Sequence, residues 1–112
     1  MIGPMVEIDT TTRRGHPVVV ATGEIDIKTA PKFESVLDRY SAEELVVDLS
    51  GVDFIDSTGL RVLARARSRL AGEGGRLVVC APEGVVRRTM SLAGLTADFD
   101  IVSSVEELEG AG

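Results

Sequence analysis

Cysteine, histidine and tryptophan are almost absent, with one cysteine, one histidine and no tryptophan in 112 residues. A single thiol cannot form an internal disulfide, which fits a protein of a reducing cytosol. Cys80 lies in the apolar run from Leu77 to Ala81, and we interpret it as a buried strand residue. The usual zinc sites need several Cys or His ligands. We therefore expect no metal site, and we expect His16 to be a surface turn residue.

Long apolar runs and basic clusters are also missing. No run approaches the 18 residues that a membrane span needs, and the opening MIGPM lacks the features of a signal peptide. The sequence thus predicts a soluble, cytoplasmic protein without membrane contact, whose native start is Met1 or Met5. The formal net charge of −6 argues against nucleic-acid binding. It discourages self-association without excluding it, so we expect a monomer or a weak homodimer.

Hydrophobic residues make up 44% of the chain, enough for one free-standing domain over residues 1–112. Periodicity and turn residues predict strands and helices in alternation. The expected strands are 6–12, 17–21, 45–49, 77–81 and 98–102, and helices are expected after Thr29, from Leu60, from Pro82 and over 105–108. The first two strands should form a hairpin around Gly15. This order predicts an α/β fold, with a mixed, mainly parallel sheet of about five strands and about four helices.

Each predicted helix has an apolar face and a start signal. Thr29 is a candidate N-cap, with Pro31 in the first turn, and Phe33, Val36, Leu37 and Tyr40 face the core. The helix from Leu60 has a broad apolar arc, in which Arg67 is the exception; its members are Leu60, Val62, Leu63, Ala64, Ala66, Leu70 and Ala71. The third helix should begin at Pro82 and Glu83 and end at Gly94, and its apolar positions are Val85, Val86, Met90, Leu92 and Ala93.

The stretch from 45 to 63, LVVDLSGVDFIDSTGLRVL, is the most informative part of the sequence. Its first five residues predict a strand that is buried on both faces. This strand should end at a turn formed by Ser50 and Gly51. A second short apolar piece with Phe54 then leads to Asp56-Ser57-Thr58, which are good N-cap residues. A hydroxyl here meets free backbone N–H groups and the positive end of the helix dipole. It should therefore be exposed and fixed in position.

Acidic residues gather around two of these turns. Glu24 and Asp26 in Gly23-Glu24-Ile25-Asp26 are most simply a solvated strand-to-helix loop. With Asp53 and Asp56 they could instead form a carboxylate cluster that binds a divalent metal in an enzyme. That reading lacks a nucleophile–base pair and a nearby histidine, so we expect no catalytic residues and no cofactor.

Three segments together resemble the STAS domain, and specifically the bacterial anti-sigma factor antagonists: GEID (23–26), VVDLSGVDFIDSTGL (46–60) and VRRTMSLAGL (86–95). The resemblance implies a regulator that is not an enzyme. It implies that Ser57 is phosphorylated by a partner that is both an anti-sigma factor and a serine kinase, and that a PP2C-type phosphatase reverses the reaction. The partner-binding residues it implies are Gly23, Glu24, Ile25, Asp26, Asp56, Ser57, Thr58, Gly59 and Leu60.

Several alternatives remain at this stage. Ser57 could be only a helix cap, Thr58 could be the modified hydroxyl, and Asp53 and Asp56 could simply shape the turn. Within the same resemblance, the domain could be a scaffold or a lipid-transport subunit, although a pure scaffold needs no phosphoacceptor. A receiver domain has a similar order of elements, but it needs a lysine after a late strand, and the last lysine here is Lys32.

Overall fold

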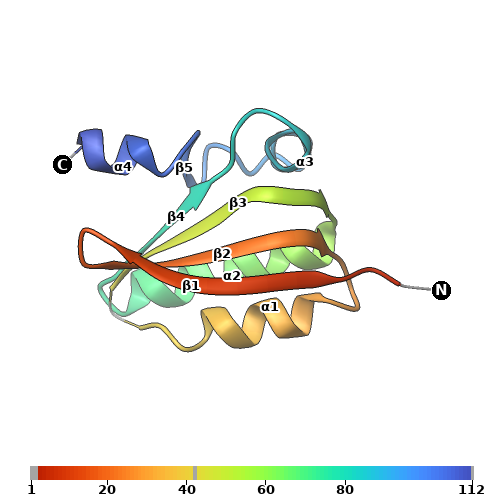
Figure 1. Ribbon diagram of the computed structural model, residues 1–112, viewed down its shortest axis with the longest axis horizontal. Coiled ribbons are helices and arrows are strands. Elements are labelled where there is room, and N and C mark those ends of the chain that lie inside the picture. The colour runs from red at the N-terminus through yellow and green to blue at the C-terminus, as the bar shows by residue number, and fades with distance from the viewer. Residues whose placement is uncertain (1–2, 42, 112) are drawn as a thin grey trace.

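The computed structural model describes residues 3–41 and 43–111, the side chains of 109–111 excepted, and shows one mixed sheet with helices packed on it (Figure 1). The elements run in the order β1 (Val6–Arg13), β2 (His16–Ile25), α1 (Ala30–Leu37), β3 (Glu44–Ile55), α2 (Ser57–Gly72), β4 (Arg76–Cys80), α3 (Val85–Leu92), β5 (Asp100–Val102) and α4 (Glu106–Ala111). The strand order is β1-β2-β3-β4-β5. β1 and β2 are antiparallel and the other pairs are parallel, so the predicted fold class is confirmed.

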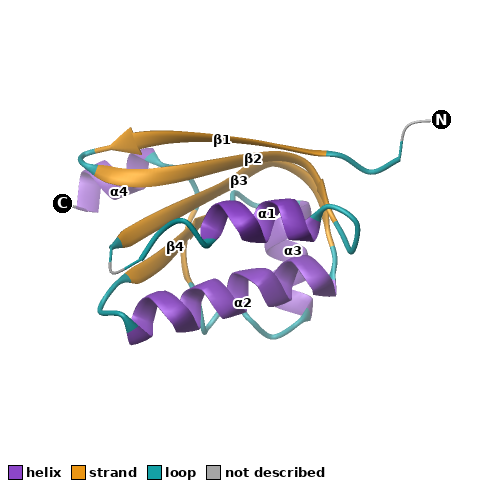
Figure 2. Ribbon diagram, turned by 90° about the horizontal axis from the view of Figure 1, so that it is seen from below, coloured by secondary structure: helices purple, strands orange, loops and turns teal. Residues whose placement is uncertain are grey.

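The main core lies between the sheet and the helices α1 and α2, which lie side by side along it (Figure 2). Phe33, Leu37, Leu63 and Leu70 are fully buried there, as the helical spacing predicts, and Met90 of α3 joins the same core. A smaller cluster on the other face of the sheet contains Val18, Val46 and Val78, with Leu108 of α4 packed against it. Apolar burial on both faces explains why the central strands read as nearly continuous hydrophobic runs.

The predicted turn at Ser50 and Gly51 is wrong, because β3 continues through both residues to Ile55. β2 is longer than predicted as well and includes Gly23, Glu24 and Ile25. The two strands stay paired across two register shifts, one of them between Val20 and Thr22. A Cβ on Gly51 would lie 2.6 Å from the methyl carbon of Thr22. The glycine therefore permits a close approach of two strands and does not end one.

Two helix starts also differ from the prediction. α3 begins at Val85 rather than at Pro82, after Gly84 with a φ of +151° at its N-cap, a region that favours glycine. Only Val86 and Met90 of this helix are buried, whereas Leu92 is 84% exposed and the other predicted apolar positions, Val85 and Ala93, are exposed as well. α2 begins at Ser57, three residues before the predicted start at Leu60.

The arginine inside the apolar arc of α2 has a structural explanation. The guanidinium carbon of Arg67 lies 5.7 Å from the centre of the Phe99 ring, within cation–π range. Phe99 is buried, and the exposed Arg67 lies over its ring at the edge of the core. Ala71, the last member of the predicted arc, is exposed. No helix in the described ranges is long and apolar enough to cross a membrane.

Candidate functional site at the start of α2

Asp56 is the residue that caps α2. Its backbone is extended, and its carboxylate oxygen Oδ1 accepts hydrogen bonds from the backbone N–H groups of Thr58 (2.9 Å) and Gly59 (3.1 Å). Its carbonyl oxygen accepts the first helical bond, from Leu60 N–H at 3.0 Å. The capping role considered for Ser57 is therefore filled by its neighbour.

Ser57 is the first residue of α2, and its side chain is exposed. Its hydroxyl makes no hydrogen bond to any residue that the structure describes. The turn beneath it is fixed, because a Cβ on Gly59 would lie 2.7 Å from Ile55 Cγ1 and 2.8 Å from Ile25 Cγ2. The site thus presents an accessible hydroxyl on a rigid support.

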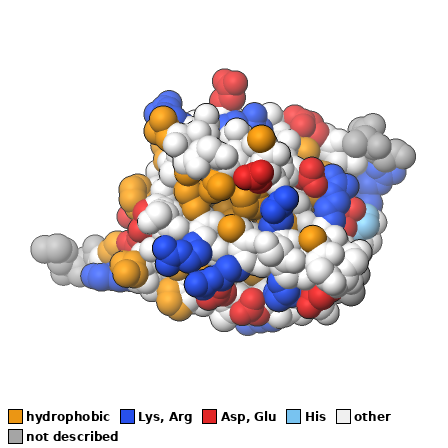
Figure 3. All heavy atoms as spheres, turned by 180° about the vertical axis from the view of Figure 1, so that it is seen from behind, with side chains coloured by type: hydrophobic (Ala, Val, Ile, Leu, Met, Phe, Trp, Pro, Cys, Tyr) orange, Lys and Arg blue, Asp and Glu red, His pale blue; other side chains and the backbone are white. Residues whose placement is uncertain are grey.

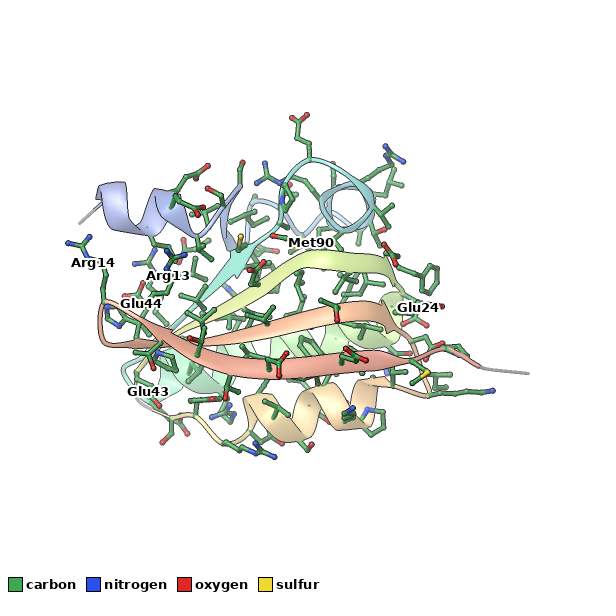
Figure 4. The ribbon with its side chains drawn as sticks, viewed as in Figure 1. Arg13, Arg14, Glu24, Glu43, Glu44 and Met90 are labelled. Atoms are coloured by element: carbon green, nitrogen blue, oxygen red, sulfur yellow. The ribbon has the colours of Figure 1, made fainter. Side chains whose placement is uncertain are left out.

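The segment Gly23–Asp26 lies beside this turn. Asp56 N–H donates to the carbonyl oxygen of Ile25 at 3.1 Å, which joins the ends of β2 and β3 just before α2 begins. Glu24 lies at this end of the sheet, whereas Arg13 and Arg14 lie at the opposite end (Figure 4). Gly23 has a φ of +102°, and a Cβ there would overlap the carbonyl oxygen of Met5. Only glycine fits this position without moving the backbone.

The loop from Asp26 to Thr29 is held by its own side chains. Thr29 is the N-cap residue of α1, but its hydroxyl makes no capping bond. It donates instead to the carbonyl oxygen of Glu24 (2.8 Å) and accepts from Asp26 N–H (2.9 Å). Asp26 Oδ1 accepts from the N–H groups of Lys28 (2.9 Å) and Thr29 (3.1 Å). Asp26 and Asp56 therefore both shape turns, a role that the sequence suggested for Asp56 but not for Asp26.

The nine residues proposed from sequence as partner-binding divide by burial. Ile25, Gly59 and Leu60 are buried and position the site, whereas Glu24 and Ser57 are exposed. The other four are half-buried: Gly23, Asp26, Asp56 and Thr58. The acids do not assemble into a metal site, because the described residues include no group of three or more His, Cys, Asp or Glu side chains placed to hold an ion.

Three exposed hydrophobic residues lie at this end of the sheet and are not among the nine residues proposed from sequence as partner-binding. Phe54 is 46% exposed and lies opposite Glu24 on the neighbouring strand. Met5, whose carbonyl oxygen accepts from Glu24 N–H, is 58% exposed, and Ile27 in the next loop is 71% exposed. Exposed apolar side chains grouped in this way are typical of protein contact surfaces. The only sequence signal was Ile27, which stands alone between Asp26 and Lys28.

Cys80, at the end of β4, is a buried strand residue as predicted, with 1% of its surface exposed. Its sulfur lies 3.6 Å from the Ser50 hydroxyl, which donates to Asp48 at 2.6 Å. Burial raises the pKa of the thiol from 9.0 to about 11. The thiol is therefore neutral at physiological pH and is no candidate nucleophile.

Comparison with known proteins identifies the class. The family model of the STAS domain matches residues 7–108, and the chain belongs to this family. It is similar to the anti-sigma-F factor antagonist RsfB of Mycobacterium tuberculosis, with 33% identity over 91% of this chain and 85% of the relative. It is also similar to the anti-sigma-B factor antagonist of Listeria monocytogenes, with 33% identity over 85% of this chain and 86% of that one.

The fold is similar to that of solved members of the family. The crystal structure of an anti-sigma factor antagonist from Mycobacterium paratuberculosis matches with a TM-score of 0.86 and 33% identity. The match covers 96% of this chain and 93% of the other. The chain thus spans 85–93% of the length of these three relatives.

Proposed function

We propose that this protein is an anti-sigma factor antagonist controlled by phosphorylation of Ser57. In its unmodified form it binds an anti-sigma factor that is also a serine kinase, and so releases a sigma factor in the bacterial cytoplasm. The names of its relatives support the class. The observation that carries the assignment of Ser57 is its exposed hydroxyl, held without an intramolecular hydrogen bond among the described residues on the rigid first turn of α2.

The proposed modification is a phosphoryl transfer from ATP bound to the kinase. Ser57 Oγ attacks the γ-phosphorus, and the bond from that phosphorus to the bridging oxygen breaks as ADP leaves. The hydroxyl proton passes to a base of the kinase. A PP2C-type phosphatase reverses the modification by hydrolysis, with water as the nucleophile and inorganic phosphate as the product. The protein itself needs to supply only the positioned hydroxyl.

The fold should change little on phosphorylation, because Ser57 is exposed and the opposing effects there are each on the order of 1 kcal/mol, small against the stability of a domain. The modification adds about −1.5 to −2 charges. A helix N-terminus stabilises an anion by about 0.3–1 kcal/mol, but two of its N–H groups already bind Asp56. A like charge near 5 Å costs about 1 kcal/mol in water and about 3 at an effective dielectric of 20, so the carboxylates of Asp56 and Asp53 oppose the phosphate.

The switch should therefore act at the docking surface. The site combines an exposed hydroxyl with apolar side chains such as Phe54 and Ile27, which a partner would cover. A dianion enclosed there without a matching cation costs several kcal/mol. A loss of about 4 kcal/mol lowers the affinity about a thousandfold. The same hydroxyl that permits close contact would then abolish it once phosphorylated.

The direct test is to incubate the protein with candidate anti-sigma kinases and ATP and to locate the phosphate by mass spectrometry. We expect a single phosphate on Ser57, which Ser57→Ala abolishes. Thr58→Ala, a matched change of the neighbouring hydroxyl, should still be phosphorylated. A phosphate on Thr58, or none with the kinase encoded for this antagonist, would contradict the proposal.

A further inference from the structure

The arginines of α2 differ in how they are bound. Three of the four contact groups of their own chain: Arg65 binds Glu34 at 3.5 Å, Arg67 lies over Phe99, and Arg69 donates to the carbonyl oxygens of Leu37 (3.0 Å) and Tyr40 (2.6 Å). Arg61 is exposed and has no ion pair or hydrogen bond from its side chain to any residue in the described ranges. Basic side chains lie over this helix on the face seen in Figure 3.

Arg61 lies one helical turn after Ser57. Side chains four residues apart are neighbours on a helix surface, and both of these are exposed. Helical side chains also lean toward the N-terminus, which lets the guanidinium of Arg61 reach back toward the turn that carries Ser57. An acidic group placed four residues before a basic one is the more favourable order of such a pair. Ser57 and Arg61 would have this order once the serine carries a phosphate.

We propose that Arg61 binds the phosphate of phosphorylated Ser57 and holds it against the outer face of α2. This inference rests on the assignment of Ser57 in the proposed function. The planar guanidinium presents paired N–H donors that match two phosphate oxygens. The pair offsets part of the repulsion by Asp56 and Asp53. Against a phosphate charge of about −1.5 to −2 it leaves a net charge of about −0.5 to −1 at the docking surface, so the block to docking remains. Arg61 is thus a positioning residue, which keeps the phosphate as an ordered surface dianion without a rearrangement of the capped turn beneath it.

The pair has a measurable electrostatic consequence. The second ionisation of a phosphoserine has a pKa near 6, and a neighbouring cation favours the dianion over the monoanion. Arg61 should therefore lower this pKa. The dianion has one more negative charge than the monoanion, and the interaction of that charge with Arg61 at this helical spacing should lower the phosphate pKa by about 0.2–0.4 unit. A larger share of the phosphate would then be dianionic at neutral pH than without Arg61.

The test uses full-length protein in which phosphoserine is incorporated at position 57 during synthesis, so that no kinase is required. The pKa of the phosphate is measured by ³¹P NMR between pH 4 and 9. We expect Arg61→Gln to raise this pKa by about 0.2–0.4 unit, and Arg61→Lys to keep most of the original value because the charge remains. Arg65→Gln removes the same charge one turn further along α2, where Arg65 is bound to Glu34, and should leave the pKa unchanged.

Two results would overturn the inference. One is the same phosphate pKa in the protein with and without Arg61→Gln. The other is an equal rise with Arg65→Gln, which would reflect net charge alone. Because the phosphate is installed without a kinase, a pKa shift specific to Arg61 supports the pair even if no kinase modifies Ser57. Conversely, if a kinase modifies Ser57 but Arg61→Gln leaves the phosphate pKa unchanged, only the pair of Arg61 and the phosphate is refuted, and the proposed function stands.

Discussion

Replacement of Asp56 by alanine tests whether the start of α2 is held as described. The change removes an oxygen that accepts two backbone N–H groups at 2.9 and 3.1 Å. Loss of an acidic N-cap costs about 0.5–2 kcal/mol. Since Asp56 is half-buried and both N–H groups lose their partner, we expect about 1.5 kcal/mol. With an entropy of unfolding of about 2 cal/mol/K per residue, Tm should fall by about 6 °C.

Urea unfolding followed by far-UV circular dichroism measures this loss. Asp56→Ser retains a capping oxygen and should lose less than half as much stability. Asp53→Ala is the matched control, because Asp53 is an exposed acid three residues earlier that caps nothing, and it should change the unfolding free energy by less than about 0.5 kcal/mol. If Asp56→Ala were no more harmful than Asp53→Ala, the cap would not hold the site and the reasoning would fail.

Three further results are expected. Gly59→Ala should lower the free energy of unfolding in urea by about 1–3 kcal/mol, although alanine favours helices. The reason is that the new Cβ would lie 2.7 and 2.8 Å from isoleucine side chains of β3 and β2. Equal or higher stability would contradict this packing. Burial raises the pKa of Cys80 to about 11, so the native thiol should react with Ellman's reagent at pH 8 at least about tenfold more slowly than the denatured thiol. The folded pKa of Cys80 lies above the unfolded value of 9.0, so the neutral thiol contributes fully to stability below pH 9 and this contribution is lost as the pH rises toward 11. Over this range the free energy of unfolding should fall by about 2–3 kcal/mol more in the native sequence than in Cys80→Ala. Parallel pH profiles of the two proteins would refute this. Ile27→Ser should change stability by less than about 0.5 kcal/mol, since Ile27 is 71% exposed, but should weaken partner capture about tenfold by calorimetry; unchanged affinity would remove Ile27 from the docking surface.

The order of strands and helices was predictable because it depends on local signals. Buried strands such as Leu77–Ala81 and the apolar arc of α2 are visible in consecutive residues. The continuation of β3 through Ser50 and Gly51 was not, because it depends on pairing with β2, which is distant in the sequence. Serine and glycine usually signal a turn. Here the glycine permits a close approach between two strands.

The same distinction applies to the site. Exposure of Ser57 followed from its place before a helix, and the structure agrees. The sequence predicts that the hydroxyl of Thr29 caps α1, but the hydroxyl donates to the carbonyl oxygen of Glu24, near the end of β2. The cation–π contact of Arg67 likewise involves Phe99, 32 positions later in the sequence. Contacts of this kind have no local sequence pattern.

The central claim is that one hydroxyl on the first turn of α2 decides whether a partner can dock. Calorimetric titration of the anti-sigma kinase with the unmodified protein and with the Ser57-phosphorylated protein measures this directly. We expect tight binding of the unmodified form and of Ser57→Ala, and a loss of about a thousandfold on phosphorylation, with Ser57→Asp also binding poorly. Equal affinities for the modified and unmodified forms would contradict the account.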